Sequence, residues 1–522
     1  MNTSNRLPTR REFLTDVGRG MITASVGFGM ARELGLAPAF AADAEARLDF
    51  GSIEPLVRLM QDTPAAKLLP VLVEKLHGGI DLRTLVTAGA FANARTFGGE
   101  DYVGFHTMMA LAPGLHMAGE LPPEQAPLPV FKVLYRNTNR MQETGGSEHE
   151  VLHPLPTATT TAAPANPGEY LREESRSGDI KRAEAAYAAT ATSPEDALNA
   201  VLYEMQDETE VHRTVLPYRA WDLLGLIGKE QATTLLRQSV RYCVKAEGWS
   251  RNNNKSRDLL VKLLDEHKLL DKTPGTRAVD DAWVEKFTDT LFTSTPEQAA
   301  IAAAAALAEG IAPDAIGESI SLAANQLILR DHGRTPEGEI TGKPIGSVHG
   351  DSIGVHACDS AGAWRNLARV ARPRNTFACL ILGSYQVALD RTNRGGDFAN
   401  WQPLPMERHV NEVKSTDPSG LLRELEEAIR GNLQARATGV MKKYGTLNHD
   451  PREAFDLLRR FAISEDGALH AEKFFRTCTE EFNTTRPAFR WRQLCALARV
   501  TASEYGRPAP GMAQARELLK LA

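Results

Sequence analysis

The segment Val211–Cys243 holds two stretches of helical periodicity joined by a short turn. The first opens near His212, spaces its apolar residues as a helix does, and breaks at Gly228. The second runs from about Glu230 with its apolar residues on one face. Helical hairpins of this kind bury their apolar faces by packing on further hairpins. The segment therefore predicts a fold built from such units.

Similar frames begin at four histidines, which are His106, His212, His356 and His470. Seventeen residues after His106, His356 and His470 comes a proline, at Pro123, Pro373 and Pro487. An Ala-Trp pair follows His212 and His356 within the first predicted helix. Because the intervals between the four histidines are unequal, we predict a closed bundle rather than a regular solenoid. The fold class that follows is all-α, a bundle of repeated helical hairpins with long inserted loops.

Two long segments interrupt the helical pattern. Residues 154–168 are rich in Pro, Thr and Ala, and we predict an exposed loop there. Residues 331–353 are rich in Gly and carry His332 and His349 just before the third frame. Long loops inside compact domains are often functional. We predict that residues 42–522 form a single large helical domain that contains both loops.

The first 41 residues resemble a twin-arginine export signal. Arg10 and Arg11 are followed by Phe-Leu, an apolar run spans Met21–Ala31, and Ala39–Ala41 provides a small-residue cleavage site. We therefore expect the twin-arginine export machinery as a partner and a periplasmic or secreted location. That route carries folded proteins, often with a cofactor already bound, which favours a metal or redox function.

Composition excludes several other classes of function. The formal net charge is −6, and no basic face with interleaved aromatic residues predicts binding to nucleic acid. No segment after the signal is long and apolar enough for stable membrane insertion. The five cysteines lack CxxC spacing, which argues against haem c and structural zinc. No GxSxG motif or complete phosphate-binding loop is present.

Histidines on separate helices of a bundle, with carboxylates one turn away, are typical of metal sites in helical proteins. If one helix runs through the acidic segment YEMQDETEVH, then Glu204 and Glu208 share a face with His212. We predict His106, His212 and His356 as catalytic residues acting on a small-molecule substrate. The predicted metal ligands, for iron or another divalent metal, are His106, His212, His356, Glu208, His349 and His470.

Three pieces of the chain resemble questin oxidase-like proteins. They contain GFHTMMAL around His106, VHRTVLPYRAWDLL from Val211, and VHACDSAGAWRNL from Val355, and the resemblance extends over about a third of the chain. The resemblance implies an α-helical fold and oxygen-dependent, ring-cleaving oxidoreductase activity. This chain departs from the family in lacking a tighter paired-histidine motif around His106 and in its long exported amino terminus.

The leading hypothesis is an exported oxidoreductase acting on a small organic substrate through a His/carboxylate metal site or a His-lined pocket. Two alternatives stay open. The first is a non-catalytic helical-repeat scaffold whose histidines are structural, since a lone helical histidine is often a hydrogen-bonded core residue. The second is a hydrolase that uses a metal-activated water at the same site.

Overall fold

A computed structural model describes residues 47–155, 165–250, 255–341, 343–348, 350, 352–395 and 398–521. All regular secondary structure in these residues is helical. They contain isolated β-bridges but no strand. The predicted all-α class is confirmed. Leu48–Ala522 forms one compact unit. The predicted export signal lies outside the described residues.

Four helical hairpins occupy the four histidine-led frames, as predicted. Each consists of a first helix, a short turn and a return helix. The pairs are α5 (Tyr102–Gly119) with α6 (Pro127–Glu143), α10 (Val211–Ile227) with α11 (Ala232–Ser250), α16 (Ile353–Val370) with α17 (Pro373–Arg394), and α22 (His470–Thr484) with α23 (Trp491–Glu504).

The other helices cover and connect these hairpins. The α-helices are α2 (Glu54–Asp62), α3 (Ala65–His77), α4 (Leu82–Phe97), α7 (Pro167–Arg176), α8 (Ile180–Thr190), α9 (Pro194–Glu204), α12 (Lys255–Glu266), α13 (Asp281–Thr293), α14 (Pro296–Ala308), α15 (Pro313–Arg330), α18 (Glu407–Asn411), α19 (Pro418–Arg430), α20 (Gln434–Thr446), α21 (Pro451–Ser464) and α24 (Met512–Leu518). Short 3₁₀ turns are η1 (Gly51–Ile53), η2 (Gly146–Glu148), η3 (Met205–Asp207), η4 (Pro336–Gly338) and η5 (Phe398–Asn400).

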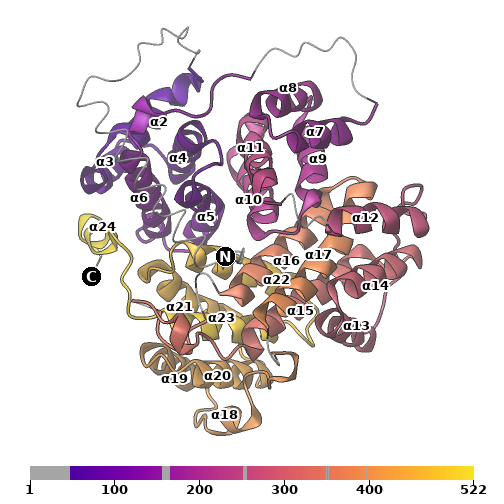
Figure 1. The fold of residues 1–522 in the computed structure, drawn as a ribbon. Coiled ribbons are helices and arrows are strands. Elements are labelled where there is room, and N and C mark those ends of the chain that lie inside the picture. Colours follow the sequence, from indigo (N-terminus) through magenta and orange to yellow (C-terminus); the bar gives the residue numbers. More distant parts are fainter. Residues whose placement is uncertain are drawn as a thin grey trace, which may run out of the picture. The chain divides into compact units, whose positions relative to one another are not determined.

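The first helices of the four hairpins pack in a closed ring. Helix α5 contacts α10, α10 contacts α16, α16 contacts α22, and α22 contacts α5 (Figure 1). Each of these helices carries its histidine in its first or second turn. The ring therefore brings four segments, separated by more than a hundred residues at each step, to one place at the amino-terminal ends of its helices.

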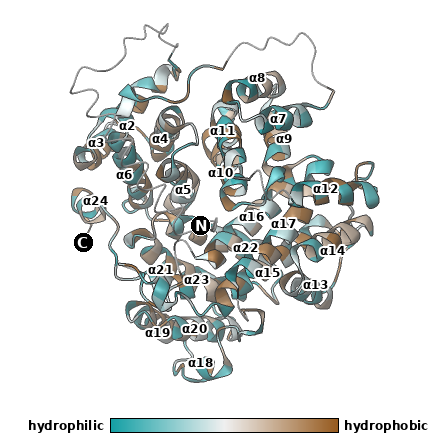
Figure 2. Cartoon of the chain, viewed as in Figure 1, coloured by the Kyte–Doolittle hydropathy of each residue, from teal (hydrophilic) through white to brown (hydrophobic). Residues whose placement is uncertain are grey.

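Local signals in the sequence explain where several helices begin. Ser193 caps α9 by accepting a hydrogen bond from the Asp196 backbone N–H, and Thr295 forms a capping box with Gln298 at the start of α14. Most helices combine hydrophobic and hydrophilic residues (Figure 2), as expected for amphipathic helices on a shared core. No helix of the described chain has the length and hydropathy that a membrane span requires.

One predicted helix is interrupted. The prediction that Glu204, Glu208 and His212 share one helical face is wrong, because α9 ends at Glu204 and α10 starts only at Val211. Between them lie the 3₁₀ turn η3 and an extended segment in which Glu208 has β geometry. The side chain of Glu210 caps α10 by accepting hydrogen bonds from the backbone N–H groups of its second and third residues, so the helix starts there.

Candidate functional site: a tetrad of histidines

The four hairpin histidines meet in space, and we call them the tetrad: His106, His212, His356 and His470. Neighbouring rings around the tetrad have centroids 4.9, 6.0, 5.1 and 5.2 Å apart, in the order His106–His212–His356–His470–His106. The Nε2 atoms form two close pairs, 3.4 Å apart in His106–His212 and 3.0 Å apart in His356–His470. Three of the rings are buried, and His356 is partly buried.

Backbone carbonyls fix the tautomers of His106 and His470. The Nδ1 atom of His106 lies 2.6 Å from the Tyr102 carbonyl, and that of His470 lies 3.1 Å from the Ala468 carbonyl. Burial, and next the positive charge of Lys473, hold the pKa of both histidines well below the usual value. Each ring is therefore neutral with its one proton on Nδ1, which leaves an Nε2 lone pair facing the other tetrad rings.

A carboxylate holds His212. Its Nδ1 lies 2.6 Å from Glu210, which also accepts a hydrogen bond of 2.9 Å from the Tyr242 hydroxyl. Burial opposes ionisation of Glu210, but the charge of His212 and the hydrogen bonds from His212 and Tyr242 lower the pKa of Glu210 to about 2. The carboxylate thus keeps a proton on Nδ1 and turns Nε2 of His212 toward His106.

Two nitrogen lone pairs repel each other at 3.0–3.4 Å. Each close pair of the tetrad therefore needs a cation between its two Nε2 atoms, either a proton or a metal ion. Because His470 presents a lone pair at Nε2, the proton in the second pair belongs to His356, which donates it across 3.0 Å. The amino-terminal ends of four helices meet here, and their partial positive charge further disfavours extra protons.

A buried polar layer lies one turn further along the helices. Asp359 and Lys473 each follow a tetrad histidine by three residues, and both are only 2 % exposed. Thr477 donates a 2.8 Å hydrogen bond to Asp359 and accepts one of 2.9 Å from Arg219, which links α22, α16 and α10. Burial raises the pKa of Asp359, and burial lowers the pKa of Lys473 to about 8. Perturbed groups of this kind cluster at functional sites.

The turn before His470 has strained backbone. Ala468 and Leu469 have φ values of 50° and 67°, in the left-handed region that residues with a Cβ rarely adopt. This conformation directs the Ala468 carbonyl at Nδ1 of His470. Gly467 precedes the turn, and a Cβ there would lie 2.9 Å from both the Ala471 backbone nitrogen and Glu504 Oε1. Strain held by such tight packing is typical of functional positions.

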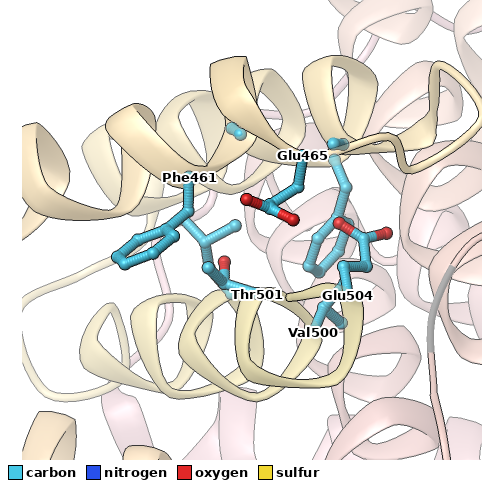
Figure 3. Close-up of a pocket in the computed structure, with 9 residues that line it drawn as sticks. Phe461, Glu465, Val500, Thr501 and Glu504 are labelled. Carbon is cyan, nitrogen blue, oxygen red and sulfur yellow. The ribbon is translucent and has the colours of Figure 1, made fainter. Parts of the chain in front are cut away.

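Buried carboxylates surround the start of α22. Figure 3 shows Glu465, just after α21, and Glu504, at the end of α23, facing the same small cavity of about 10 Å³. Burial raises the pKa of Glu504 to about 8, so it is protonated at neutral pH. Glu472, in the first turn of α22, is fully buried and pairs with Lys132 of α6 at 2.6 Å. Lys132 also donates to the Ala462 and Glu465 carbonyls, so α6 braces this end of α22.

The structure brings four of the six predicted metal ligands together. Glu208 instead lies 3.9 Å from the Arg213 guanidinium and is about one-third exposed. His349 lies outside the described residues. The carboxylate that holds a tetrad histidine is Glu210, which a continuous helix would have turned away from the face of His212. Asp359 and Lys473 were not among the predicted site residues, although both stand three residues after a candidate histidine.

The donor atoms of the tetrad stand as two pairs rather than around one point. Accordingly, no group of three or more His, Cys, Asp or Glu side chains in the described parts of the chain is arranged to hold a metal ion as the side chains stand. All five cysteines are free and buried, and none of them belongs to such a group within the described residues. The tetrad nevertheless has the chemistry of a ligand set, since three of its rings direct Nδ1 at an acceptor and Nε2 inward.

Comparison with protein-family models, with curated proteins and with solved structures finds no match to this chain. The functional argument therefore rests on the geometry of the tetrad and the groups around it.

Proposed function

We propose that the tetrad binds one transition-metal ion and is the catalytic centre of an oxidoreductase that acts on a small organic molecule. The observation that carries this proposal is the meeting of four imidazoles from four separate hairpins, with Nε2 facing inward on all four. A purely structural role would require four histidines from separate hairpins to turn their Nε2 atoms toward one another in one buried place. Packing alone gives no reason for that arrangement.

The donor set fits a metal ion. Neutral imidazoles are ligands for iron, copper and zinc. Two nitrogens bound to one ion at about 2.0–2.1 Å in tetrahedral fashion stand about 3.3 Å apart, and the two Nε2 pairs are 3.4 and 3.0 Å apart. His106, His212, His356 and His470 would hold the ion, which would supply one-electron chemistry to a bound substrate and oxygen. The proton shared in the His356–His470 pair would leave when the ion binds.

The remaining residues have defined tasks in this proposal. Glu210 keeps His212 in the tautomer that offers Nε2, and the Tyr102 and Ala468 carbonyls do the same for His106 and His470. Lys473 adds positive charge beside the tetrad, which favours an anionic form of the substrate. Tyr102 is half exposed and its ring lies 4.5 Å from that of His106. We place substrate access on this side.

Two other functions remain alternatives. The two Nε2 pairs are within hydrogen-bond distance, which would also allow a metal-free proton-transfer site. A metal held by the tetrad could instead activate water for hydrolysis. Metal content and oxygen consumption separate these functions. Only the metal-dependent functions require a bound ion, and only the oxidase consumes oxygen.

The decisive experiment is elemental analysis of the chain purified without a histidine tag. We expect about one iron or copper ion per chain, and we expect His212→Ala and His356→Ala each to lose it. Zinc, which is redox-inactive, would favour the hydrolase instead. His449→Ala is the matched control, because His449 is only partly buried and donates from Nε2 to the Thr416 carbonyl rather than to a tetrad residue. If the wild-type protein stays metal-free after reconstitution with each of the three ions, the metal site is wrong.

Export through the twin-arginine pathway is part of the same proposal. It is supported by the Arg10-Arg11 pair and the apolar run that follows. Replacing both arginines by lysine should leave the protein in the cytoplasm when cell fractions are compared. Secretion of the variant at the wild-type level would contradict the proposed route.

A further inference from the structure

A second cavity, whose lining includes none of the tetrad histidines, has a volume of about 530 Å³. It lies where the start of α17 meets α7, α8 and α9. Cavities of this size commonly bind small organic molecules. Its wall combines apolar groups with a few polar ones; those used below are Tyr203, Leu270, Pro373, Arg374 and Asn375.

Arg374 lines this cavity without a counter-ion. Its guanidinium stacks on the ring of Tyr203, 4.0 Å from the ring centroid. Nη1 donates to the side-chain oxygens of Asn375, at 3.1 Å, and of Gln206. Within the described ranges no carboxylate lies within 4.0 Å of the guanidinium, and Nε and Nη2 have no hydrogen-bond partner. Burial lowers the pKa of Arg374, as expected for an uncompensated cation.

Neutral amides hold Arg374 in place. Gln206 and Asn375 are buried and joined by a 3.3 Å hydrogen bond, and Asn375 donates at 3.1 Å to the side chain of Asn199. This network orients the guanidinium but supplies no negative charge. By contrast, the neighbouring Arg372 is exposed and pairs with Asp196. The chain therefore neutralises one arginine of this turn and leaves the other free toward the cavity.

The backbone at this point adds further donors. Helix α17 begins with Pro373, and no side chain caps its first turn. The backbone N–H groups of the first turn of a helix lack partners inside the helix and favour negative charge. The uncapped turn and the free edge of the Arg374 guanidinium belong to the same wall of the cavity.

The geometry points to this cavity as a binding site for a small organic carboxylate. Its carboxylate lies against Arg374 and the first turn of α17, and its apolar body lies against Tyr203 and the side chain of Leu270. Bidentate pairing with a guanidinium is the arrangement that best fits a planar carboxylate. Leu270 is 57 % exposed in the absence of such a ligand and would be covered by one. The inference does not depend on the function proposed for the tetrad.

The test is isothermal titration calorimetry of the full chain with benzoate, with hexanoate, and with neutral benzamide. We expect saturable binding of one equivalent of at least one of the two carboxylates, and affinity for benzamide at least about tenfold lower than for benzoate where benzoate binds. Arg374→Met should weaken carboxylate binding by about tenfold or more, and Arg374→Lys should fall in between because it keeps the charge but not the fork. The comparison with benzamide needs no variant and so does not depend on how Arg374→Met folds.

Arg369→Met is the matched control. It removes the same charge from the same hairpin, but Arg369 pairs with Asp314 away from the cavity, so affinity should stay within about twofold of wild type. His356→Ala should bind the carboxylate as wild type does, which separates this site from the tetrad. Absence of saturation with both carboxylates up to about 10 mM would overturn the proposal, as would equal affinity of wild type and Arg374→Met.

Discussion

The two halves of the tetrad are held in different ways. On the α5–α10 side, His212 depends on a carboxylate, Glu210, which is itself fixed by the Tyr242 hydroxyl. On the α16–α22 side, His470 depends on a backbone carbonyl presented by a strained turn. On the α5–α10 side, the position of His212 depends on one side chain. On the α16–α22 side, the position of His470 depends on a turn and on the buried groups that pack behind it.

This difference shows how equivalent positions of a repeated hairpin acquire distinct chemistry. Glu210 lies in extended backbone two residues before His212, because the chain leaves helical geometry after α9. The turn before His470 is braced by α6, since Lys132 bonds to Glu472 and to two carbonyls, and Arg136 pairs with Asp466. We therefore expect His470 to be displaced by changes that destabilise the packing around α22. We expect His212 to be displaced by the loss of a single hydrogen bond.

The largest expected effect is the loss of the buried ion pair behind α22. Lys132→Met leaves Glu472 fully buried and without its cation, which should lower the free energy of unfolding by about 3–5 kcal/mol. Denaturant-induced unfolding measures this loss. Lys262→Met, which removes a lysine from an exposed pair with Glu266, should cost about 1 kcal/mol or less. Equal effects of the two changes would mean that α6 does not support the α22 side.

Much of the fold follows from periodicity in the sequence, whereas the acidic break does not. The four hairpins were predicted because apolar spacing, Gly228 and the prolines mark helix ends locally. The segment YEMQDETEVH contains neither Gly nor Pro, so no residue in it predicts the end of a helix. The break depends on Glu210 capping α10 and on Asp207 pairing with Arg176, and the second of these contacts lies outside any local window.

The second prediction concerns the protonated carboxyl beside the turn. The pKa of Glu504 is about 8 in the folded protein, against an ordinary value of 4.5. A raised pKa means that the folded state binds the proton more tightly, so this group's stabilisation is complete below about pH 4.5 and is lost as pH rises toward 8. Glu504→Gln keeps a neutral side chain of the same shape, so the loss of stability with rising pH does not occur at this position. The stability of the variant relative to wild type should rise by about 1–3 kcal/mol between pH 5 and pH 8 and then level off.

Unfolding in denaturant at a series of pH values provides the measurement. Glu309→Gln, which removes an exposed carboxylate, serves as the control and should keep a constant difference from wild type over the same range. A constant difference for Glu504→Gln as well would show that Glu504 is ionised in the folded protein. The α22 side would then lack the buried proton that distinguishes it.

The third prediction tests the α10 side and rests on the proposed metal site. Glu210→Gln weakens the acceptor that holds Nδ1 of His212, and changes of this kind cost about 10–100-fold in metal affinity. Competition with a chelator measures the affinity. Glu208→Gln is the control, because Glu208 faces Arg213 rather than the tetrad. If Glu208→Gln loses the metal and Glu210→Gln keeps it, the carboxylate chosen from the sequence is the correct one.

The candidate site could be predicted only in part. The four histidines share a frame position, which the sequence displays, so their meeting was expected. The polar layer under them needs the register of three helices at once, because Thr477 joins Asp359 to Arg219 across α22, α16 and α10. The cavity at Arg374 is harder to predict from the sequence, because Gln206 and Asn375 are 169 residues apart. No short-range pattern specifies which amides will hold an arginine.

The smallest expected effect concerns the strained turn itself. Ala468 is exposed and has a φ of 50°, so Ala468→Gly removes the left-handed strain without removing a buried side chain. Relief of about 1–2 kcal/mol is offset by the greater freedom of glycine in the unfolded chain, which leaves a gain of about 0.5–1 kcal/mol in the free energy of unfolding. The same change loosens the carbonyl that holds His470, so metal affinity should fall slightly while stability rises. Opposite signs in unfolding and chelator competition would show that the turn stores strain to aim this ring. A gain in both would mean that the turn is only a connection, and that the two halves of the tetrad differ less than their contacts suggest.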